Sequence, residues 1–436
     1  MSSEWAKFTD LLETIVDNRG KTCPVVKTGL PLIATNCING KDLYPSYETT
    51  RFVSDETYKT WFRGHPKPGD ILFVCKGSPG RTNWVPDPVD FCIAQDMVAV
   101  RADPKKVYPK YLFAVLRSHI VQSQIDNMHV GTMIPHFKKG DFDKLNIPLL
   151  NSGSQVAVGD LYFELSQRIT LLRETNSTLE AIAQALFKSW FVDFDPVRAK
   201  MEGRAPDGMD EATAALFPDG FEESELGLVP KGWTNAPIYD MATFINGAAY
   251  KAFEPNAERR GRPIIKIAEL KSGVTTQTAY SDVAMPDKYL IETGDILFSW
   301  SGNPDTSIDT FVWTFEKAWL NQHIFRVLPN ASHERTFVLQ MLRHLKPLFT
   351  ELARNKQTTG LGHVTVADMK RELIAMPPVD LVRQFDLKVG PIHARIFENQ
   401  RQAQTLATLR DTLLPRLISG QLRLPEAQAA AAEALA

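Results

Sequence analysis

This chain has few cysteines, no long apolar run and no N-terminal pattern typical of a signal peptide. Its 436 residues include four cysteines, and none of them stands in a C-x-x-C pair. Reduced, buried thiols are therefore expected rather than disulfides, and no metal ligands are predicted. No apolar run approaches the roughly 18 residues of a membrane span, and the first residues lack the blocks of a signal peptide. These absences predict a cytoplasmic protein without a membrane segment. The cysteines are Cys23, Cys37, Cys75 and Cys92.

A large excess of charge of one sign is also missing. The net charge is −2, but it divides unevenly along the chain. Residues 1–150 carry 19 Lys+Arg and 16 Asp+Glu, residues 228–380 carry 17 and 16, and residues 199–227 carry 2 and 8. The acidity thus lies in a connector between two balanced to slightly basic regions. Because a concentrated basic footprint is missing, any DNA binding must rely on local clusters or on a partner's charge.

Motifs for catalysis are missing as well. The chain has no Asn/Asp-Pro-Pro-aromatic motif and no G-x-x-x-x-G-K-[ST] loop, and residues 77–81 (GSPGR) lack the required lysine. His323 and His363 have no partners at metal-ligand spacing, so surface or packing roles are expected for them. No catalytic residue is predicted, and a non-catalytic role is favoured.

What the chain does contain is a long internal repeat. The pentapeptide GDILF occurs at residues 69–73 and again at 294–298, a spacing of 225 residues. Further matches follow in order, with offsets that stay between 225 and 229. A period of this length excludes a solenoid and indicates two domain-sized copies with two equivalent working surfaces. The further matches include Trp5 with Trp233, Gln95 with Gln322, Pro148 with Pro377, Gln155 with Gln384, and Leu179 with Leu406.

Each copy has the same predicted order of elements. About 150 residues of short apolar runs separated by Gly, Pro, Asn and Asp predict short strands with turns and some helical pieces. A long helix then follows, over residues 155–192 in the first copy and 384–418 in the second. The predicted fold class is α+β, with two globular α/β domains of short mixed strands related by a pseudo-twofold axis.

Both long helices carry a heptad pattern of apolar residues. Sustained a/d spacing favours an antiparallel coiled coil between them, each helix spanning about 50–55 Å at about 1.5 Å per residue. Two separate amphipathic helices, each packed on its own domain, are the alternative. The d positions are Val158, Leu165, Leu172, Leu179 and Leu186, then Phe385, Ile392, Asn399, Leu406 and Leu413. The a positions are Tyr162, Ile169, Asn176, Ala183 and Trp190, then Val389, Ile396, Ala403, Arg410 and Leu417.

Two asparagines stand in this pattern near the middle of the helices. Asn176 occupies an a position and Asn399 a d position, and antiparallel coils layer a against d. Two arrangements remain open: a shared core layer with a mutual hydrogen bond, or two separately solvated amides at the edge of the coil.

Three segments carry a resemblance to a known family. Residues 186–197 (LFKSWFVDFDPV) resemble the central conserved region of the specificity subunits of type I restriction-modification systems. Residues 225–233 (ELGLVPKGW) resemble the start of that family's second recognition domain, and residues 409–420 (LRDTLLPRLISG) its distal conserved region. In this order the motifs are specific, and the resemblance covers the chain up to the alanine-rich tail.

The resemblance implies an organisation and a function. Two target-recognition domains, residues 1–150 and 228–380, would each read one half of a bipartite, asymmetric DNA site. Conserved helices at 151–198 and 381–424 would set the spacer and dock the methyltransferase subunits. Residues 199–227 form the acidic linker and 425–436 the tail.

The resemblance also implies partners. They are double-stranded DNA, two methyltransferase (modification) subunits and, in a restricting complex, two motor-nuclease (restriction) subunits. This chain itself binds no cofactor, whereas S-adenosylmethionine, ATP and Mg²⁺ are expected on the partner subunits. The alternatives are the recognition chain of a methylation-only system and a coiled-coil scaffold that does not bind DNA.

The polar loops after each GDILF segment, with nearby basic clusters, predict the DNA contacts. Arg and Lys there suit phosphates, while Arg, Asn and Gln can read base edges; an ordinary solvated surface is the alternative. The candidate DNA-binding residues are Lys76, Ser78, Arg81, Asn83, His136, Lys138, Lys139, Arg259, Arg260, Arg262, Ser301, Asn303, Arg354, Lys356, Gln357 and Thr358. The candidate partner-docking residues are Phe187, Trp190, Phe191, Leu413 and Leu417, with core packing as the alternative for Trp190.

Overall fold

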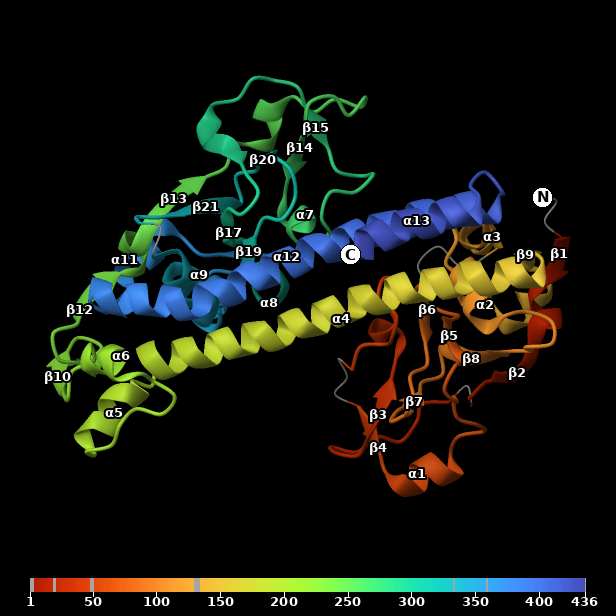
Figure 1. The fold of residues 1–436 in the computed structure, drawn as a ribbon, viewed down its shortest axis with the longest axis horizontal. Coiled ribbons are helices and arrows are strands. Elements are labelled where there is room, and N and C mark those ends of the chain that lie inside the picture. Colours follow the sequence, from red (N-terminus) through yellow and green to blue (C-terminus); the bar gives the residue numbers. More distant parts are fainter. Residues whose placement is uncertain are drawn as a thin grey trace. The chain divides into compact units, whose positions relative to one another are not determined.

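The chain folds into two compact units (Figure 1). A computed structural model describes residues 4–18, 21–47, 51–128, 134–331, 334–357 and 360–435. Unit 1 comprises Met1–Arg173 and Gln402–Ala436, and unit 2 comprises Glu174–Arg401. Because unit 1 takes up both ends of the chain, the C-terminal segment folds with the N-terminal domain.

Unit 1 combines mostly antiparallel strands with helices. A four-stranded sheet has the order β2-β8-β5-β6, a three-stranded sheet the order β4-β3-β7, and β1 pairs with β9. The strands are β1 (Glu4–Lys7), β2 (Leu12–Val16), β3 (Leu30–Ile33), β4 (Phe52–Val53), β5 (Ile71–Val74), β6 (Thr82–Trp84), β7 (Cys92–Ile93), β8 (Met97–Ala102) and β9 (Asn146–Leu149). The helices are α1 (Asp55–Thr60), α2 (Pro109–Leu116), α3 (His119–Met128) and α13 (Leu424–Leu435).

Unit 2 repeats this plan. The sheet β13-β21-β17-β19 matches β2-β8-β5-β6, and the parallel pair of β14 with β20 matches the parallel pair of β3 with β7. The shared strand order confirms the predicted duplication and the α+β class. The strands are β10 (Phe221–Ser224), β11 (Gly227–Pro230), β12 (Thr234–Pro237), β13 (Ala242–Asn246), β14 (Arg262–Ile265), β15 (Tyr280–Ser281), β16 (Leu290–Ile291), β17 (Ile296–Ser299), β18 (Ser301–Gly302), β19 (Asp309–Val312), β20 (Ala318–Leu320), β21 (Ile324–Pro329), β22 (Gly362–His363) and β23 (Leu373–Met376). The helices are α5 (Asp195–Met201), α6 (Glu211–Ala215), α7 (Ile267–Ser272), α8 (Pro304–Ser307), α9 (Arg335–His344), α10 (Lys346–Asn355) and α11 (Val366–Arg371).

The repeated GDILF motif builds the central strand of each unit. The strand residues are buried, and the preceding glycine has φ +86° at Gly69 and +98° at Gly294, which a side chain rarely adopts. The aspartate closes the turn and binds an arginine on the neighbouring strand: Asp70 Oδ1 lies 2.8 Å from Arg101 Nε. In unit 2, Asp295 pairs with Arg326, also at 2.8 Å. The motif therefore has a structural role, because a buried carboxylate needs a charged partner.

The two long helices are each 40 residues long: α4 (Ser152–Phe191) and α12 (Val379–Ile418). They begin three and five residues before the predicted starts. Asn151 accounts for the first difference, because its side chain accepts a hydrogen bond from Ser154 N at 2.9 Å and caps the helix. The Pro378 carbonyl accepts from Leu381 N at 3.0 Å and starts α12 directly after the two prolines.

Within each unit the segments of α4 and α12 run antiparallel and share a core. In unit 1, Val158 and Leu165 of α4 lie in one cluster with Leu406 and Leu413 of α12. In unit 2, the end of α4 meets the beginning of α12, where the rings of Trp190 and Phe385 lie 5.7 Å apart. The predicted heptad pairing is therefore confirmed, since buried a and d positions from both helices meet inside each unit.

The asparagine layer is present in unit 2. Asn399 Nδ2 donates to Asn176 Oδ1 at 2.9 Å, and Asn176 Nδ2 donates to the Ile396 carbonyl at 3.1 Å. Asn399 is buried, so its amide depends on this partner. Of the two arrangements that the sequence left open, the shared layer is correct. A single polar layer of this kind fixes the register of a helix pair.

The alanine-rich tail forms a helix of its own, and the acidic connector also contains regular elements. Ala427 and Ala431 of α13, four residues apart and hence on one face, are buried in the core of unit 1. Helices α5 and α6 and the hairpin of β10 with β11 lie in the connector region. Among the described residues, no helix is both long enough and apolar enough for a membrane span.

We expect a double-mutant cycle to detect the asparagine pair. Asn176→Leu or Asn399→Leu alone should lower the free energy of unfolding by about 1–3 kcal/mol, because each removes the hydrogen bond between the two amides and leaves the other amide without that partner. The double variant should lose less than the sum of the two, with a coupling on the order of 1 kcal/mol. Denaturant unfolding of the four proteins measures this. Strictly additive effects would show that the amides do not depend on each other.

Candidate nucleic-acid interface

Three segments of unit 1 come together where β5 ends. The Cys75 N–H donates to the Asp96 carbonyl at 2.9 Å, and the Phe137 N–H donates to the Cys75 carbonyl at 2.9 Å. These bonds gather the loop at residues 75–81, the turn before β8 and residues 135–139 into one cluster. Segments far apart in the sequence thus form one polar loop surface at one end of the central sheet.

Unit 2 gathers the equivalent segments in the same way. The Trp300 N–H donates to the His323 carbonyl at 3.4 Å, and the Val364 N–H donates to the Trp300 carbonyl at 2.9 Å. Ser301 of β18 also pairs with His363 of β22. The offsets of 225 and 227 residues are those of the repeat, so the duplication reproduces the loop cluster as well as the sheets. We call each of these three-segment sites a loop cluster.

The first loop cluster carries exposed cations. Lys76, Arg81 and Lys138 are exposed, and their side chains form no ion pair or hydrogen bond with any residue that the structure describes. Lys139 instead forms an ion pair with Asp17, also in unit 1. Three of the predicted cations are therefore available for an anionic ligand such as a phosphate backbone.

In the second loop cluster the candidate cations are neutralised within the chain. Arg354 Nη2 lies 2.5 Å from Asp305 Oδ1, and Lys356 Nζ lies 2.6 Å from a carboxylate oxygen of Asp368. Asn303 accepts from the Asp305 N–H at 3.0 Å and caps α8. The structure thus brings Arg354 to the loop that contains Asn303. Neither the sequence spacing nor the charge pattern predicted this contact.

Five further candidates have varied positions. Ser78 and His136 are half-buried, and the backbone of His136 forms an isolated bridge with residue 76. Ser301 is half-buried in β18, and Gln357 is exposed after α10. Thr358 lies outside the described residues.

The arginines at the start of β14 form a separate group, at the sheet of unit 2 with the order β15-β14-β20-β16. Arg259 donates to the Thr278 carbonyl at 3.2 Å and covers the ring of Tyr280, so it braces its own loop. Arg260 lies 2.8 Å from Asp282. Arg262 is exposed and covers the Trp319 ring at 5.2 Å. Of the three, Arg262 is the one without a carboxylate or carbonyl partner among the described residues.

Asn83 has a different role from the predicted one. Its side chain is fully buried, and its Nδ2 donates to the carbonyls of Asp42 and Tyr44 at 2.7 and 3.1 Å. Its Oδ1 accepts from the Asn39 N–H at 3.1 Å. With donors and acceptor all satisfied, this amide holds a loop to β6 and is not a base reader.

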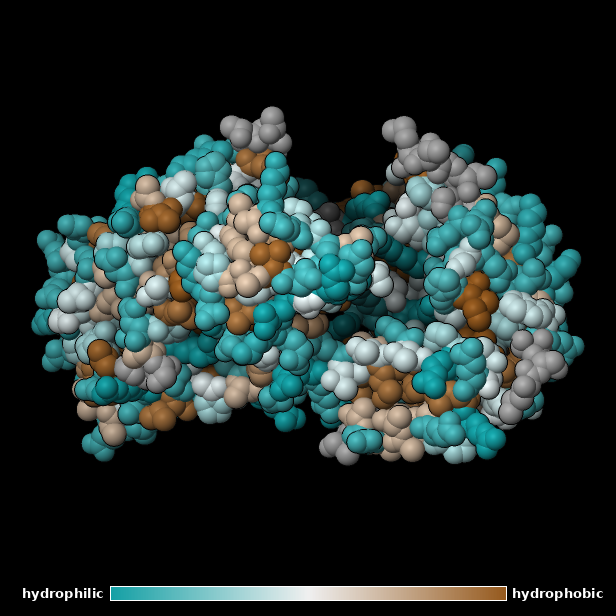
Figure 2. Space-filling view, turned by 90° about the horizontal axis from the view of Figure 1, so that it is seen from above, coloured by the Kyte–Doolittle hydropathy of each residue, from teal (hydrophilic) through white to brown (hydrophobic). Residues whose placement is uncertain are grey.

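The predicted docking residues are core residues within the units. Phe187, Trp190 and Phe191 are buried in the core of unit 2, and Leu413 and Leu417 in that of unit 1. A docking surface made of these side chains is therefore not exposed. The hydrophobic residues that are exposed on the face seen in Figure 2 lie among hydrophilic ones. For Trp190 the alternative of core packing is the correct one.

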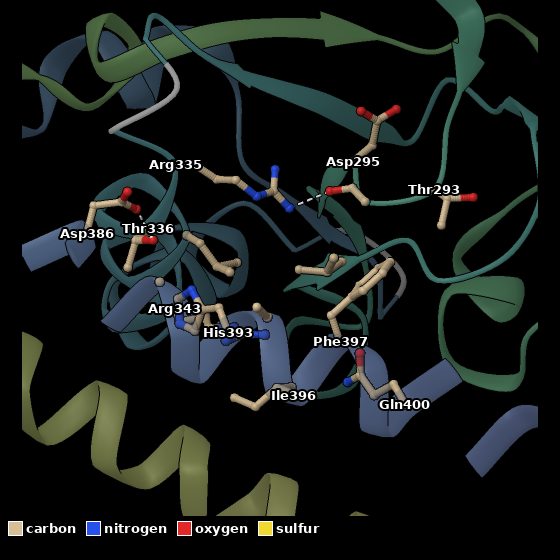
Figure 3. A pocket seen from close by; sticks show the side chains of 15 residues that line it. Thr293, Asp295, Arg335, Thr336, Arg343, Asp386, His393, Ile396, Phe397 and Gln400 are labelled. Carbon is tan, nitrogen blue, oxygen red and sulfur yellow. Dashed lines mark hydrogen bonds between the residues drawn. The ribbon is translucent and has the colours of Figure 1, made fainter. Parts of the chain in front are cut away.

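A cavity of about 620 Å³ lies in unit 2 between α9, α12 and the turn before β17, at the other end of that strand from the loop cluster (Figure 3). Arg335 reaches from α9 to the Gly294 carbonyl, and Thr336 donates to Asp386. Arg343 and His393 lie side by side on facing helices. No sequence spacing predicted this cavity, because its walls come from three separate stretches of chain.

A buried polar network joins three helices next to this cavity. Gln340 Nε2 of α9 lies 3.0 Å from Glu180 Oε1 of α4 and 2.8 Å from His393 Nε2 of α12. Arg343 also pairs with Glu180. Burial, reinforced by the nearby Arg343, lowers the pKa of His393 to about 4. His393 is therefore neutral near pH 7, where its ring nitrogen can accept from Gln340.

The low pKa of His393 predicts a loss of stability in mild acid. Because the unfolded chain takes up a proton near pH 6.5 and the folded chain only near pH 4, stability should fall as pH drops from about 6.5 to 4.5, by about 2–3 kcal/mol from this residue. His393→Gln should show a shallower fall over that window in denaturant titrations. Equal slopes would contradict the assignment.

Comparison with known families matches two stretches, residues 25–181 and 230–385, to the type I restriction modification DNA specificity domain. The specificity subunit of the type I restriction enzyme MjaIX from Methanocaldococcus jannaschii is 24% identical over 324 residues, covering 73% of this chain and 70% of its own. The specificity subunit of the type I restriction enzyme HindI from Haemophilus influenzae is 25% identical over 410 residues, covering 82% and 87%.

A solved structure shares the fold. The crystal structure of the type I restriction-modification system S subunit from M. genitalium has 15% sequence identity to this chain and a TM-score of 0.51. The match covers 96% of this chain and 96% of that one. The two matched stretches make up more than half of the chain, and each includes one loop cluster. The chain therefore belongs to the family defined by the type I restriction modification DNA specificity domain, which it contains twice.

Proposed function

We propose that this chain is the DNA specificity subunit of a type I restriction-modification complex, in which each unit reads one half of a bipartite DNA site. The observation that carries the proposal is the duplicated loop cluster. Two matched specificity domains present the same three segments, joined by the same backbone hydrogen bonds, at the same end of the central strand. Two similar reading surfaces with different side chains suit a site of two different halves.

The charges of the loop clusters support contacts between unit 1 and the phosphate backbone of DNA. Lys76, Arg81 and Lys138 can neutralise phosphates, and such contacts position a duplex without reading its sequence. Unit 2 offers fewer available cations, because Arg354 and Lys356 are already paired. The two halves of the site should therefore differ in the salt dependence of their binding.

The remaining parts of the proposal concern the assembly. The chain itself would be non-catalytic, and two methyltransferase subunits would bind S-adenosylmethionine and modify the DNA. Motor-nuclease subunits with ATP and Mg²⁺ would be needed for cleavage, and the complex would act in the cytoplasm. The length of α4 and α12, about 60 Å each at about 1.5 Å per residue, supports their role in setting the unread spacer.

Exchange of one recognition domain tests the proposed function. We replace residues 1–150 with the corresponding domain of another member of the family and map the methylated motif in cells that contain the methyltransferase subunit. One half of the motif should change, while the other half and the spacer length stay the same, because unit 2 and both long helices are retained. If both halves change together, or if no bipartite motif appears, the two-reader proposal is wrong.

Replacing single lysines tests the proposed contacts with the DNA phosphate backbone. Lys76→Ala and Lys138→Ala should each weaken binding to cognate and non-cognate duplexes alike and lower the salt slope of binding by about one unit per lost contact. Lys144→Ala is the matched control, because Lys144 is exposed in the same region but already paired with Asp141. Fluorescence anisotropy at several salt concentrations measures the slopes. A slope unchanged by Lys138→Ala would remove that residue from the interface.

A further inference from the structure

Each loop cluster contains a glutamine at the same place. Gln95 precedes Asp96, whose carbonyl accepts from the end of β5, and Gln322 precedes His323, whose carbonyl accepts from the end of β17. The two glutamines are 227 residues apart, the same offset as that between Asp96 and His323. They are therefore equivalent residues of the two copies.

Neither glutamine is required by the fold. Gln95 is exposed, and its side chain forms no hydrogen bond with any residue that the structure describes. Gln322 is half-buried, and among the described residues its amide reaches the adjacent His323 ring alone, at 3.2 Å. Neither residue has a positive φ, so the backbone does not restrict the residue type. Packing, capping and turn geometry thus give no reason for a glutamine at either site.

The residues beside the glutamines differ between the copies. Gln95 stands between Ala94 and Asp96, whereas Gln322 stands between Asn321 and His323. A polar residue outside the core that is the same in both copies while its neighbours differ points to a ligand rather than to the fold. Because the two units are proposed to read different sequences, a shared residue suits a chemical feature that both half-sites possess.

The surroundings of Gln95 and Gln322 place their side-chain amides where a contact with a DNA base is possible. The Lys76 N–H donates to the Asp96 carbonyl at 3.2 Å, so an exposed phosphate-binding candidate lies directly beside Gln95. In unit 2, the ring of Trp300 lies 5.7 Å from that of His323, and its Nε1 donates to Asn246 Oδ1 at 3.1 Å. Each glutamine therefore stands on a braced turn within its loop cluster; the Gln95 amide is exposed, and the Gln322 amide contacts the neighbouring His323 ring, a contact that a base could replace.

We infer that Gln95 and Gln322 each read an adenine, one in each half of the DNA site. A carboxamide presents one acceptor and two donors, which match the N6 donor and N7 acceptor on the major-groove edge of adenine in a two-bond contact. A neutral amide gains less from phosphate than a cation does, and cations are present nearby for that task. This inference rests on the proposed function and deepens it, since it assigns a base to one residue of each unit.

The test removes one hydrogen-bond acceptor from the DNA at a time. Cognate duplexes, defined by methylation mapping, are prepared with 7-deazaadenine in place of single adenines, which removes N7 and keeps base pairing. The wild-type full-length chain, with its methyltransferase partner, should lose affinity about 10- to 100-fold at one adenine in each half-site. Gln95→Ala should bind the natural duplex more weakly by a similar factor and be insensitive to 7-deazaadenine at one half only. Gln322→Ala should show the same at the other half.

The controls separate this inference from other outcomes. Gln167→Ala changes an exposed glutamine on α4 of unit 1 and should bind like the wild type. Thermal unfolding should be unchanged in all three variants, and the salt slopes should be too, because no phosphate contact is lost. Wild-type affinity in Gln95→Ala, a salt slope lowered by about one unit, or persisting sensitivity to 7-deazaadenine would each overturn the inference. Absence of sequence-specific binding by the wild type would instead overturn the proposed function.

Discussion

A buried amide between two helices needs a hydrogen-bond partner, and the buried Asn399 finds one in Asn176 of the facing helix. Their hydrogen bond is 2.9 Å long, so sliding either helix by one turn would leave the buried Asn399 amide without this partner. The register of α4 on α12 in unit 2 depends on this layer. The three-helix network of Glu180, Gln340 and His393 lies within two turns of it and ties α9 to the same pair.

The need to pair buried polar groups also shapes each recognition domain. Asp70 and Asp295 close the turn that begins the central strand, and each is neutralised by an arginine of the next strand. The arginines are not at equivalent sheet positions, because Arg101 lies beyond the partner of Ile71, whereas Arg326 pairs with Leu297. Duplication therefore preserved the interaction rather than the residue that supplies it. The GDILF motif, which repeats in the sequence, is therefore a structural requirement of each sheet.

The two loop clusters share a backbone and differ in charge. Unit 1 exposes Lys76, Arg81 and Lys138, whereas unit 2 pairs Arg354 and Lys356 with aspartates. A rigid, repeated frame with divergent side chains is what two readers of different half-sites require, because recognition depends on loop residues held by the scaffold. The nearly neutral chain is consistent with this division, since only part of its surface offers cations to DNA.

The sequence by itself determined the duplication, the α+β class, both long helices and the heptad positions of Asn176 and Asn399, while the structure decided that the two amides share a layer. The features that the sequence determined follow from periodicity and spacing, which are properties of neighbouring residues along the chain. Tertiary structure alone decided that Asn83 is buried, that Arg260 and Lys356 are paired with carboxylates, and that Phe187 and Trp190 belong to a core. It also decided the loop clusters and the cavity beside His393. The partners in these contacts come from other strands and helices, and no local pattern records which side chains folding will bring together.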